Sequence, residues 1–404
     1  MIDLTVIADD LTGAADCGIA FSLAGLPTYV AFAGAPAPAA ARILVVDTDS
    51  RALTPTAAAE RTRAAARNAH RQGAGLIYKK IDSTLRGHIG AELAALCEAA
   101  AEAGRPPVTI IAPAFPRLGR MTRHGRVLVD GIPLGETEVW NRSGMQGPAD
   151  LVPLLRLAGF EAEVATQPDA LPRLVAGGAR MVVCDAGHDD DLRGIAEAGA
   201  RIPGHVIWVG SAGLARHLPA ALRLQPSADP PAAPWPAGPI LTLVGSRSSI
   251  SREQARRLAV EPEVASFMLE AGSLLAGEKD AGWAAAAAGL ERALAAGRDV
   301  VMIISPEPHV DLRQGPALAA ALGRLAAPHR DRLGGLVATG GDTAKAVLTA
   351  MGAGGVRLVR ELEAGVPIGL ADLARPLPFI AKSGGFGQPS TLQHCRAALK
   401  QGRI

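Results

Sequence analysis

The sequence predicts an α/β protein with two domains and mainly parallel sheets. Along its 404 residues, short apolar runs rich in Val and Ile alternate with helical stretches rich in Ala, Leu and Arg. This alternation is typical of α/β folds. Several runs are apolar at almost every position, as expected for parallel strands covered on both faces. A single proline-rich segment interrupts the pattern, which then resumes.

The first half of the chain supplies seven predicted strands and four predicted helices. The strands are 4–8, 28–32, 43–47, 76–80, 108–112, 181–185 and 205–210. The helices are 13–25, 54–72, 90–103 and 211–223. We expect this half to form a domain over residues 1–224.

The segment 225–239 marks the predicted domain boundary, because it holds six prolines in fifteen residues. Proline blocks the hydrogen bonds of helices and sheets, so this segment is expected to be a stiff linker. The second domain is predicted over 240–404. Its strands are 240–245, 264–269, 300–305 and 336–339. Its helices lie between the first two of these strands, over 281–296, and from Asp342 onwards.

Composition excludes several classes of function. The net charge is +2 with both signs spread along the chain, so no nucleic-acid-binding arm is expected. No apolar run approaches the roughly 18 residues of a membrane span, and the N-terminal residues lack the basic segment of a secretory signal. The four cysteines lie far apart, without a CxxC pair. These features predict a cytoplasmic enzyme with no membrane partner.

Lysine is rare, and its positions are informative. Only six of the 41 basic residues are lysines. Four of these, Lys79, Lys80, Lys345 and Lys382, lie in motifs rich in Gly, Ser, Thr and Asp. A lysine ammonium is a compact charge suited to phosphates and carboxylates. The pattern therefore predicts that the protein binds a small anion.

Two motifs of the first domain follow predicted strands, where ligands of open parallel sheets bind. In ADDLTGAAD (8–16), Asp9 and Asp10 precede a helix. One of them could bind a hydroxyl, act as a base or hold Mg²⁺, or both could simply cap the helix. The second motif, KKIDSTLRGHIGAE (79–92), combines cations with acceptors and hydroxyls, namely Lys79, Lys80, Arg86, Asp82, Ser83 and Thr84.

Such a mixture suits a ligand with one acid group and several hydroxyls. Arg51, in VDTDSR after the third strand, is expected to face the same crevice. Its planar guanidinium could donate two parallel hydrogen bonds to a carboxylate.

Three motifs of the second domain have the character of anion-binding loops. LVGSRSSISREQ (243–254) presents backbone N–H groups and hydroxyls before a helix. In LVATGGDTAKAVL (336–348), Gly340 and Gly341 allow close approach of phosphates, and Asp342 could be a general base or a magnesium ligand. In FIAKSGGFGQPST (379–391), Lys382 and Ser383 precede the glycine pair Gly384 and Gly385.

Taken in order, these motifs resemble the four-carbon acid sugar kinase family, formerly catalogued as a domain of unknown function. The resemblance also rests on APAFPRLGRMTRHG (112–125), CDAGHDDDL (184–192), VGSAGLARHL (209–218) and EAGVPIG (363–369), so that it covers almost the whole chain. The chain departs from the family pattern at WNRSGMQGP (140–148), where an Asp-Pro element is expected.

The resemblance implies a two-domain enzyme that uses ATP to phosphorylate the terminal hydroxyl of threonate, erythronate or a 3-oxo-tetronate. It assigns the acid sugar to the first domain and ATP to the second. Asp10, Arg51, Lys80, Asp82 and Ser83 would then line the acid-sugar site. The nucleotide site would draw on Ser246, Ser248, Gly340, Gly341, Asp342, Thr343 and Gly384.

The expected reaction is Mg²⁺-dependent transfer of the γ-phosphoryl group in a cleft that closes to exclude water. The substrate carboxylate would pair with Arg51 and with Lys80 or Arg86, while Asp10 and Asp82 orient its hydroxyls. The triphosphate would lie on residues 340–343 and 383–385. Asp342 is the preferred base by fold-level analogy with ribokinase-type sugar kinases, and Asp10 or Asp82 is the alternative. A homodimer is also compatible with an enzyme of this size.

Two other functions fit less well. A dehydrogenase or aldolase acting on the same acids would need a cofactor motif or a Schiff-base or zinc constellation, and the sequence has no GxGxxG, P-loop, HExxH or GxSxG motif. A two-lobed sugar-acid sensor would need only one anion site, whereas both predicted domains carry anion-type motifs.

Overall fold

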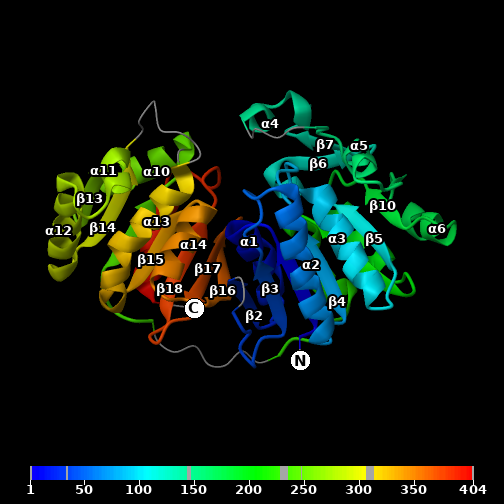
Figure 1. Cartoon of the computed structure of the whole chain (residues 1–404), viewed down its shortest axis with the longest axis horizontal. Coiled ribbons are helices and arrows are strands. Elements are labelled where there is room, and N and C mark those ends of the chain that lie inside the picture. Colours follow the sequence, from blue (N-terminus) through cyan, green and yellow to red (C-terminus); the bar gives the residue numbers. More distant parts are fainter. Residues whose placement is uncertain are drawn as a thin grey trace. The chain divides into compact units, whose positions relative to one another are not determined.

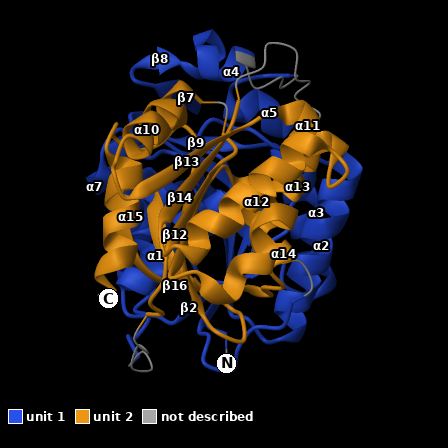
Figure 2. Ribbon diagram, turned by 90° about the vertical axis from the view of Figure 1, so that its left-hand side faces the viewer, with its two compact units in different colours: residues 1–228 blue, residues 229–404 orange. Residues whose placement is uncertain are grey.

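The computed structural model describes residues 2–32, 35–142, 147–227, 235–246, 248–305 and 314–402. The chain divides into two compact units, residues 1–228 and 229–404, which Figure 2 shows in different colours. The division lies inside the proline-rich segment. Residues 228–234 of that segment, and residues 143–146 of the departure from the family pattern, lie outside the described residues.

Unit 1 is built on a parallel sheet. In spatial order its strands are β2 (Thr28–Phe32), β3 (Ile43–Asp47), β1 (Leu4–Ala8), β4 (Leu76–Lys80), β11 (His205–Gly210), β5 (Pro107–Ala112), β10 (Met181–Cys184) and β9 (Glu163–Ala165). Each of these strands runs parallel to its neighbours. A small antiparallel sheet of β6 (Arg120–Arg123), β7 (Arg126–Val129) and β8 (Ile132–Pro133) follows β5.

Helices cover both faces of the unit 1 sheet. The long helices are α1 (Leu11–Leu23), α2 (Pro55–Arg71), α3 (Ile89–Glu102) and α7 (Asp189–Gly199), and the shorter ones are α4 (Glu138–Arg142), α5 (Leu151–Leu157), α6 (Ala170–Ala176), α8 (Ala212–Ala215) and α9 (Leu218–Ala221). Figure 1 shows α2 and α3 side by side on one face, where they contact each other extensively.

Apolar packing makes this sheet a rigid platform. On the face of α2 and α3, Ile7, Ile77 and Ile111 of the strands pack against Leu93 and Leu96 of α3. All five side chains are fully buried. Burying one such side chain contributes about 1.5–3 kcal/mol. The loops at the strand ends are therefore held by a well-packed core.

Unit 2 contains a mixed sheet. Its spatial order is β13 (Val264–Leu269), β14 (Asp299–Ile304), β12 (Ile240–Val244), β15 (Gly335–Thr339), β18 (Leu377–Lys382), β17 (Val366–Ala371) and β16 (Gly355–Glu363). The first five strands are parallel, and β17 is antiparallel to both β16 and β18.

Helices α10 (Ser249–Ala259) and α15 (Thr391–Gln401) contact each other and share one apolar core with the unit 2 sheet. The remaining helices of the unit are α11 (Ala271–Ala276), α12 (Ala281–Ala295), α13 (Gly315–Ala326) and α14 (Gly341–Ala350). Among these, α13 packs closely against α14 (Figure 1).

The predicted α/β class with mainly parallel sheets is confirmed, and most predicted elements agree with the structure to within two residues at each end. The prediction of one helix over 211–223 is wrong. The chain instead forms α8 and α9, separated at His217. Pro219 cannot donate a backbone hydrogen bond and would clash with the preceding turn, so the helix stops and restarts before it. The antiparallel strands β16 and β17 and the sheet of β6 to β8 were not predicted.

Candidate functional site

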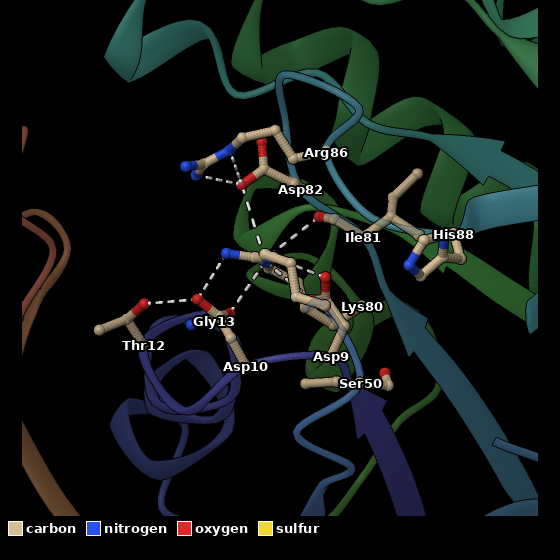
Figure 3. Close-up of polar contacts among 12 residues, drawn as sticks. Asp9, Asp10, Thr12, Gly13, Ser50, Lys80, Ile81, Asp82, Arg86 and His88 are labelled. Carbon is tan, nitrogen blue, oxygen red and sulfur yellow. Dashed lines mark hydrogen bonds and ion pairs between the residues drawn. The ribbon is translucent and has the colours of Figure 1, made fainter. Parts of the chain in front are cut away.

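Three loops of unit 1 meet because their strands are neighbours. The parallel strands β3, β1 and β4 lie side by side, so their carboxyl ends share one edge of the sheet. The residues that follow these ends are Asp9 and Asp10 after β1, Arg51 after β3, and Asp82 after β4. Figure 3 shows the acidic side chains gathered with Lys80 beside the first turn of α1. This is the sheet edge at which Arg51 was expected from the sequence to face the same crevice as the motifs 8–16 and 79–92.

Arg51 is the centre of this cluster. Its guanidinium donates Nε and Nη2 to the two oxygens of Asp9, at 2.7 and 2.8 Å. It also donates Nη1 and Nη2 to Asp10, at 2.6 and 3.0 Å, and Nη2 lies 3.7 Å from Asp82 Oδ2. Every nitrogen of the fork is therefore engaged by a carboxylate. Arg51 holds three acidic residues in one place.

These ion pairs set the protonation of the cluster. Burial opposes ionisation of Asp9, but Arg51, with help from Lys79 and Lys80, outweighs it and lowers the pKa of Asp9. Burial also opposes the charge of Arg51, yet Asp10, Asp9 and Asp82 raise its pKa well above the ordinary value. Asp9 and Arg51 consequently carry full charges at neutral pH.

Asp10 both caps a helix and joins the cluster. Its Oδ1 accepts from the Gly13 backbone N–H at 2.9 Å, and its Oδ2 accepts from the Thr12 hydroxyl at 2.8 Å. A Cβ added to Gly13 would lie 2.5 Å from Asp10 Oδ1 and 3.0 Å from Lys80 Nζ. Glycine is thus needed there so that carboxylate and ammonium can approach the helix start.

Asp82 organises the loop after β4. Its Oδ1 accepts from the backbone N–H of Thr84 at 2.8 Å and from the Thr84 hydroxyl, while its Oδ2 accepts from Arg86 Nη2 at 2.6 Å and Nε at 3.2 Å. Burial is outweighed by Arg86, Arg51 and Lys80, so the pKa of Asp82 lies far below its ordinary range. Next in the loop, Leu85 adopts a positive φ of 56°, a conformation that costs energy for a residue with a side chain.

The two adjacent lysines of β4 have different surroundings, because successive side chains of a strand point to opposite faces. Lys80 points to the cluster and donates to the backbone carbonyl of Ile81 at 2.9 Å. Lys79 is fully buried and pairs with Glu92 of α3 at 3.1 Å. Glu92 also accepts from Ser50 at 2.8 Å. Lys79 was predicted to bind substrate; it instead belongs to the protein interior and is left out of the site.

Arg86 is the most accessible cation of the cluster, with 43% of its side chain exposed. Asp82 outweighs partial burial and raises the pKa of Arg86. Ser83 lies half-buried in the same loop. Counting Lys80, Arg51 and Arg86 against Asp9, Asp10 and Asp82, the cluster is balanced in charge.

A second set of loops meets in unit 2 for the same topological reason. Strands β12, β15 and β18 are parallel neighbours. Among the described residues, their carboxyl ends lead into Gly245, Ser246 and Ser248, into 340–343, and into 383–387 respectively. The backbone N–H of Gly340 donates to the Lys382 carbonyl at 2.8 Å, which ties two of the loops together. The three predicted anion-type motifs therefore lie at one sheet edge.

Close contacts between these loops require small residues. A Cβ on Gly384 would lie 2.0 Å from Ser246 Oγ, and a Cβ on Gly245 would lie 2.1 Å from Thr343 Oγ1. Gly340 adopts a φ of 94°, a value that favours glycine. Ser246 in turn accepts from the backbone N–H of Ser248 at 3.2 Å.

At the surface of this site, Gly385 and Asp342 are exposed, and Gly341 is half-buried at the start of α14. Lys382 was predicted to contact the nucleotide. In the structure it is fully buried beneath the 383–388 loop and donates to carbonyls of that loop. It therefore supports the loop from below.

Sequence reasoning missed several residues that shape the two sites. Ser50 and Glu92 were not singled out in unit 1, nor were Ser251 and Gln254 of α10 in unit 2. The last two are polar residues three positions apart, which places them on one face of a helix. That spacing was the only available signal.

Within the described ranges, no three His, Cys, Asp or Glu side chains are grouped so as to hold a metal ion. Nor does any described helix combine the length and the hydrophobicity of a membrane span.

Comparisons with known proteins agree with this two-part architecture. Residues 4–218 match the family model described as a sugar-binding N-terminal domain, and residues 241–392 match the model described as a nucleotide-binding C-terminal domain. These matches define the class of two-domain proteins with a sugar-binding and a nucleotide-binding half. The chain belongs to the four-carbon acid sugar kinase family, as its motifs predicted.

Named relatives are similar over nearly their whole length. The chain is 40% identical to a D-threonate kinase of Cupriavidus necator, with 98% of each chain covered. It is 33% identical to a D-threonate kinase of Salmonella typhimurium, with 96% of each covered. It is also 32% identical to a 3-oxo-tetronate kinase of Methylobacterium radiotolerans, over 95% of this chain and 96% of that one.

Solved structures share the fold. A Haemophilus influenzae protein of the family DUF1537 superimposes with a TM-score of 0.74 at 23% identity, covering 98% of this chain and all of that one. A DUF1537 protein of Bordetella bronchiseptica is 33% identical over the full length of both chains, with a TM-score of 0.50. Its structure is described as a domain-swapped dimer with bound citrate.

Proposed function

We propose that the protein is an ATP-dependent kinase that phosphorylates the terminal hydroxyl of a four-carbon acid sugar, with D-threonate as the first substrate to test. The observation that carries this proposal is the pairing of two different ligand sites. Unit 1 gathers acids and cations around Arg51, whereas unit 2 gathers glycine and serine loops. The names of the relatives support the same substrate class.

In unit 1 we assign the substrate carboxylate to Arg86 and Lys80. Arg51 is saturated by Asp9 and Asp10, so it cannot take a carboxylate without breaking those pairs. Arg86 bonds Asp82 through Nε and Nη2 only, which leaves Nη1 without a partner in the described chain. Arg51 then acts as a positioning residue for the acids, and Asp10, Asp82 and Ser83 face the substrate hydroxyls.

In unit 2 we assign the nucleotide phosphates to the loops after β12, β15 and β18. Backbone N–H groups of Gly341 and Gly384, and hydroxyls of Ser246, Ser248 and Thr343, are suited to phosphate oxygens. The exposed Gly385 lies on the same loop as Gly384. The contact of Gly384 with Ser246 shows how tightly these loops pack.

The chemical step is an in-line displacement. The substrate hydroxyl oxygen bonds to the γ-phosphorus as the bond between that phosphorus and the bridging oxygen of ADP breaks. The hydroxyl proton passes to a carboxylate, for which we propose Asp342, an exposed residue in the first turn of α14. Asp82 is a poor base, because its oxygens are occupied by Thr84 and Arg86 and its pKa is strongly lowered.

Mg²⁺ fits this site as a partner of the nucleotide. Protein sites usually hold Mg²⁺ through one or two carboxylates together with substrate phosphates, and the exposed Asp342 stands beside the proposed phosphate loops. When bound, the ion would neutralise charge on the phosphate oxygens.

We also propose that the enzyme is cytoplasmic and forms a homodimer. The four cysteines are free, as in a reducing compartment, and the Bordetella bronchiseptica relative is described as a dimer. Light scattering of the purified protein measures its mass in solution, and a monomeric mass at micromolar concentration would contradict the dimer.

A coupled ADP-release assay tests the kinase proposal. The purified full-length protein is mixed with Mg-ATP and a panel of D- and L-threonate, D- and L-erythronate and their 3-oxo forms. We expect turnover with D-threonate and none without an acceptor. The Asp342→Asn variant serves as a control for contaminating kinases, because its kcat should be strongly reduced.

The possible outcomes separate the parts of the proposal. Turnover with a different tetronate keeps the kinase and changes its substrate. If no acid of the panel is turned over but ADP still raises the melting temperature, only the acid-sugar assignment is overturned. If no acid is turned over and ADP has no effect on the melting temperature, the kinase proposal is overturned.

A further inference from the structure

Three buried side chains hold the carbonyl groups of the 383–388 loop. Ser251 Oγ donates to the carbonyl of Gly384 at 2.8 Å. Gln254 Nε2 donates to the carbonyls of Phe386 and Gln388, at 3.2 and 2.8 Å. Lys382 Nζ donates to the carbonyls of Ser383 and Phe386, at 2.9 and 2.8 Å. We call Ser251, Gln254 and Lys382 the carbonyl clamp.

The clamp is part of the rigid interior. All three of its side chains are fully buried. Ser251 and Gln254 lie on the face of α10 that packs against the loop, and Lys382 is the last residue of β18. Lys382 Nζ also lies 3.4 Å from Ser251 Oγ, so the clamp residues of the helix and the strand contact each other.

The hydrogen bonds from the clamp to the loop carbonyls also fix the direction of the backbone N–H groups that follow them. In a trans peptide the C=O and the N–H that follows it point in opposite directions. With the carbonyls of Ser383, Gly384 and Phe386 turned inward, the N–H groups of Gly384, Gly385 and Gly387 turn outward. Among the described residues, nothing accepts from the amides of Gly384 and Gly385. Outward amides without partners are suited to an anion.

We propose that Ser251, Gln254 and Lys382 are positioning residues for the nucleotide: by holding the loop carbonyls inward, they aim the glycine amides at its phosphates. The inference deepens the proposed function and rests on it. The clamp residues themselves do not touch the ligand. Their role is to prevent the loop from turning its carbonyl oxygens towards the phosphates. Carbonyl oxygens in that orientation would repel the phosphate oxygens.

The lysine adds a pH signature. Burial lowers the pKa of Lys382 to about 8, although Cys395 of α15 and Glu363 of β16 oppose that shift. Glu363 itself pairs with His394, and the clamp residues of α10 are uncharged. Lys382 is therefore charged below pH 8 and loses its proton as the pH rises through 8. A neutral amine holds the carbonyls less firmly, so nucleotide affinity should fall over that range.

Calorimetric titration of the full-length protein with Mg-ADP tests the clamp. We expect Ser251→Ala and Gln254→Met to raise the Kd about 10-fold, and Lys382→Met to raise it by more, since hydrogen bonds to charged groups are the stronger ones. In the kinase assay the KM for ATP should rise while the KM for the acid sugar stays constant. Wild-type affinity should weaken above pH 8, and that dependence should vanish in Lys382→Met.

Lys400→Met is the matched control. Lys400 pairs with Asp299 at 3.1 Å, and Asp299 starts β14, at the sheet edge opposite the loops. This variant should bind Mg-ADP as the wild type does. If Lys382→Met does not fold, the Ser251→Ala and Gln254→Met variants decide the result, with melting temperatures confirming that they are folded.

Two negative results have different meanings. Folded clamp variants that bind Mg-ADP with wild-type affinity and pH dependence would overturn this inference and leave the proposed function intact. Wild-type protein that binds no Mg-ADP would overturn the proposed function, and the inference with it.

Discussion

The two candidate sites are built from different materials. In unit 1 the site consists of charged side chains, with Asp9, Asp10 and Asp82 held by Arg51 and Arg86. In unit 2 it consists of backbone and hydroxyl groups, and its buried cation, Lys382, lies beneath the loop. Both occupy the carboxyl edge of a parallel arrangement of strands, so the same topology supports two kinds of recognition.

This difference indicates how each site would accept its ligand. The hydroxyls of a ligand of unit 1 must exchange places with groups that already donate to the carboxylate oxygens, while its carboxylate meets Nη1 of Arg86. Such exchange favours a molecule that offers both a carboxylate and hydroxyls. A ligand of unit 2 meets amides that are already oriented, so little reorganisation is needed. Each of the following changes tests one side of this contrast.

The largest expected effect concerns the catalytic base. Asp342→Asn should lower kcat by a factor of about 10²–10⁴, the usual contribution of general-base catalysis. Asp10→Asn and Asp82→Asn should act mainly on the KM for the acid sugar, because those carboxylates are occupied as structural acceptors. Steady-state kinetics of the three variants separates the two behaviours.

Asp331→Asn is the control for this series, because Asp331 is 80% exposed in a loose pair with Arg330. It should leave kcat and both KM values unchanged. A near-normal kcat in Asp342→Asn would remove that residue from the mechanism and leave Asp10 as the alternative base.

The second effect concerns Arg51. Arg51→Ala leaves Asp9 buried without its bidentate partner, and breaking such a pair typically costs about 3–5 kcal/mol. We therefore expect a large loss of stability together with a raised KM for the acid sugar. Denaturant unfolding and kinetics measure both. Mg-ADP affinity should not change, because the nucleotide is assigned to unit 2.

Arg67→Ala is the matched control for Arg51→Ala. Arg67 also forms a two-nitrogen pair, with Glu102, but at an exposed position. Its removal should have no measurable effect on unfolding, since exposed pairs contribute little. If Arg51→Ala proved as stable as Arg67→Ala, the acidic cluster would not depend on Arg51.

The sequence was informative where local signals govern structure. Strand ends followed by Asp, Arg or Gly located both sheet edges, because parallel strands bring their carboxyl ends together. The different surroundings of Lys79 and Lys80 could also have been predicted from the sequence. Adjacent residues of a strand face opposite sides, so at most one of this pair could join the cluster on a given face.

Other features depended on contacts between distant segments. Gln254 reaches the carbonyl of Gln388, 134 positions away, and Ser50 reaches Glu92 across two elements. No spacing in the sequence indicates which loop a buried polar side chain meets. The same holds for Arg51: no spacing in the sequence indicates that Asp9 and Asp10 engage its whole guanidinium, the contacts for which we propose Arg86 and Lys80 as partners of the substrate carboxylate.

The smallest expected effect is the loss at low pH of the stability that the Asp82 carboxylate contributes. The folded-state pKa of Asp82 lies below its ordinary value of 3.8. A lowered pKa stabilises the fold at pH values above the unfolded-state value, and this contribution is lost as pH falls through the folded-state pKa. Asp82→Asn should therefore be less stable than the wild type at pH 7, by about 2 kcal/mol, and the difference should shrink below about pH 4. Urea unfolding at pH 7, 5 and 3.5 measures it, with Asp331→Asn expected to match the wild type throughout. If the difference in unfolding free energy between Asp82→Asn and the wild type stayed constant down to pH 3.5, the charge of Asp82 would not be what stabilises its loop. The hydrogen bonds of Asp82 to Thr84 would then be the explanation.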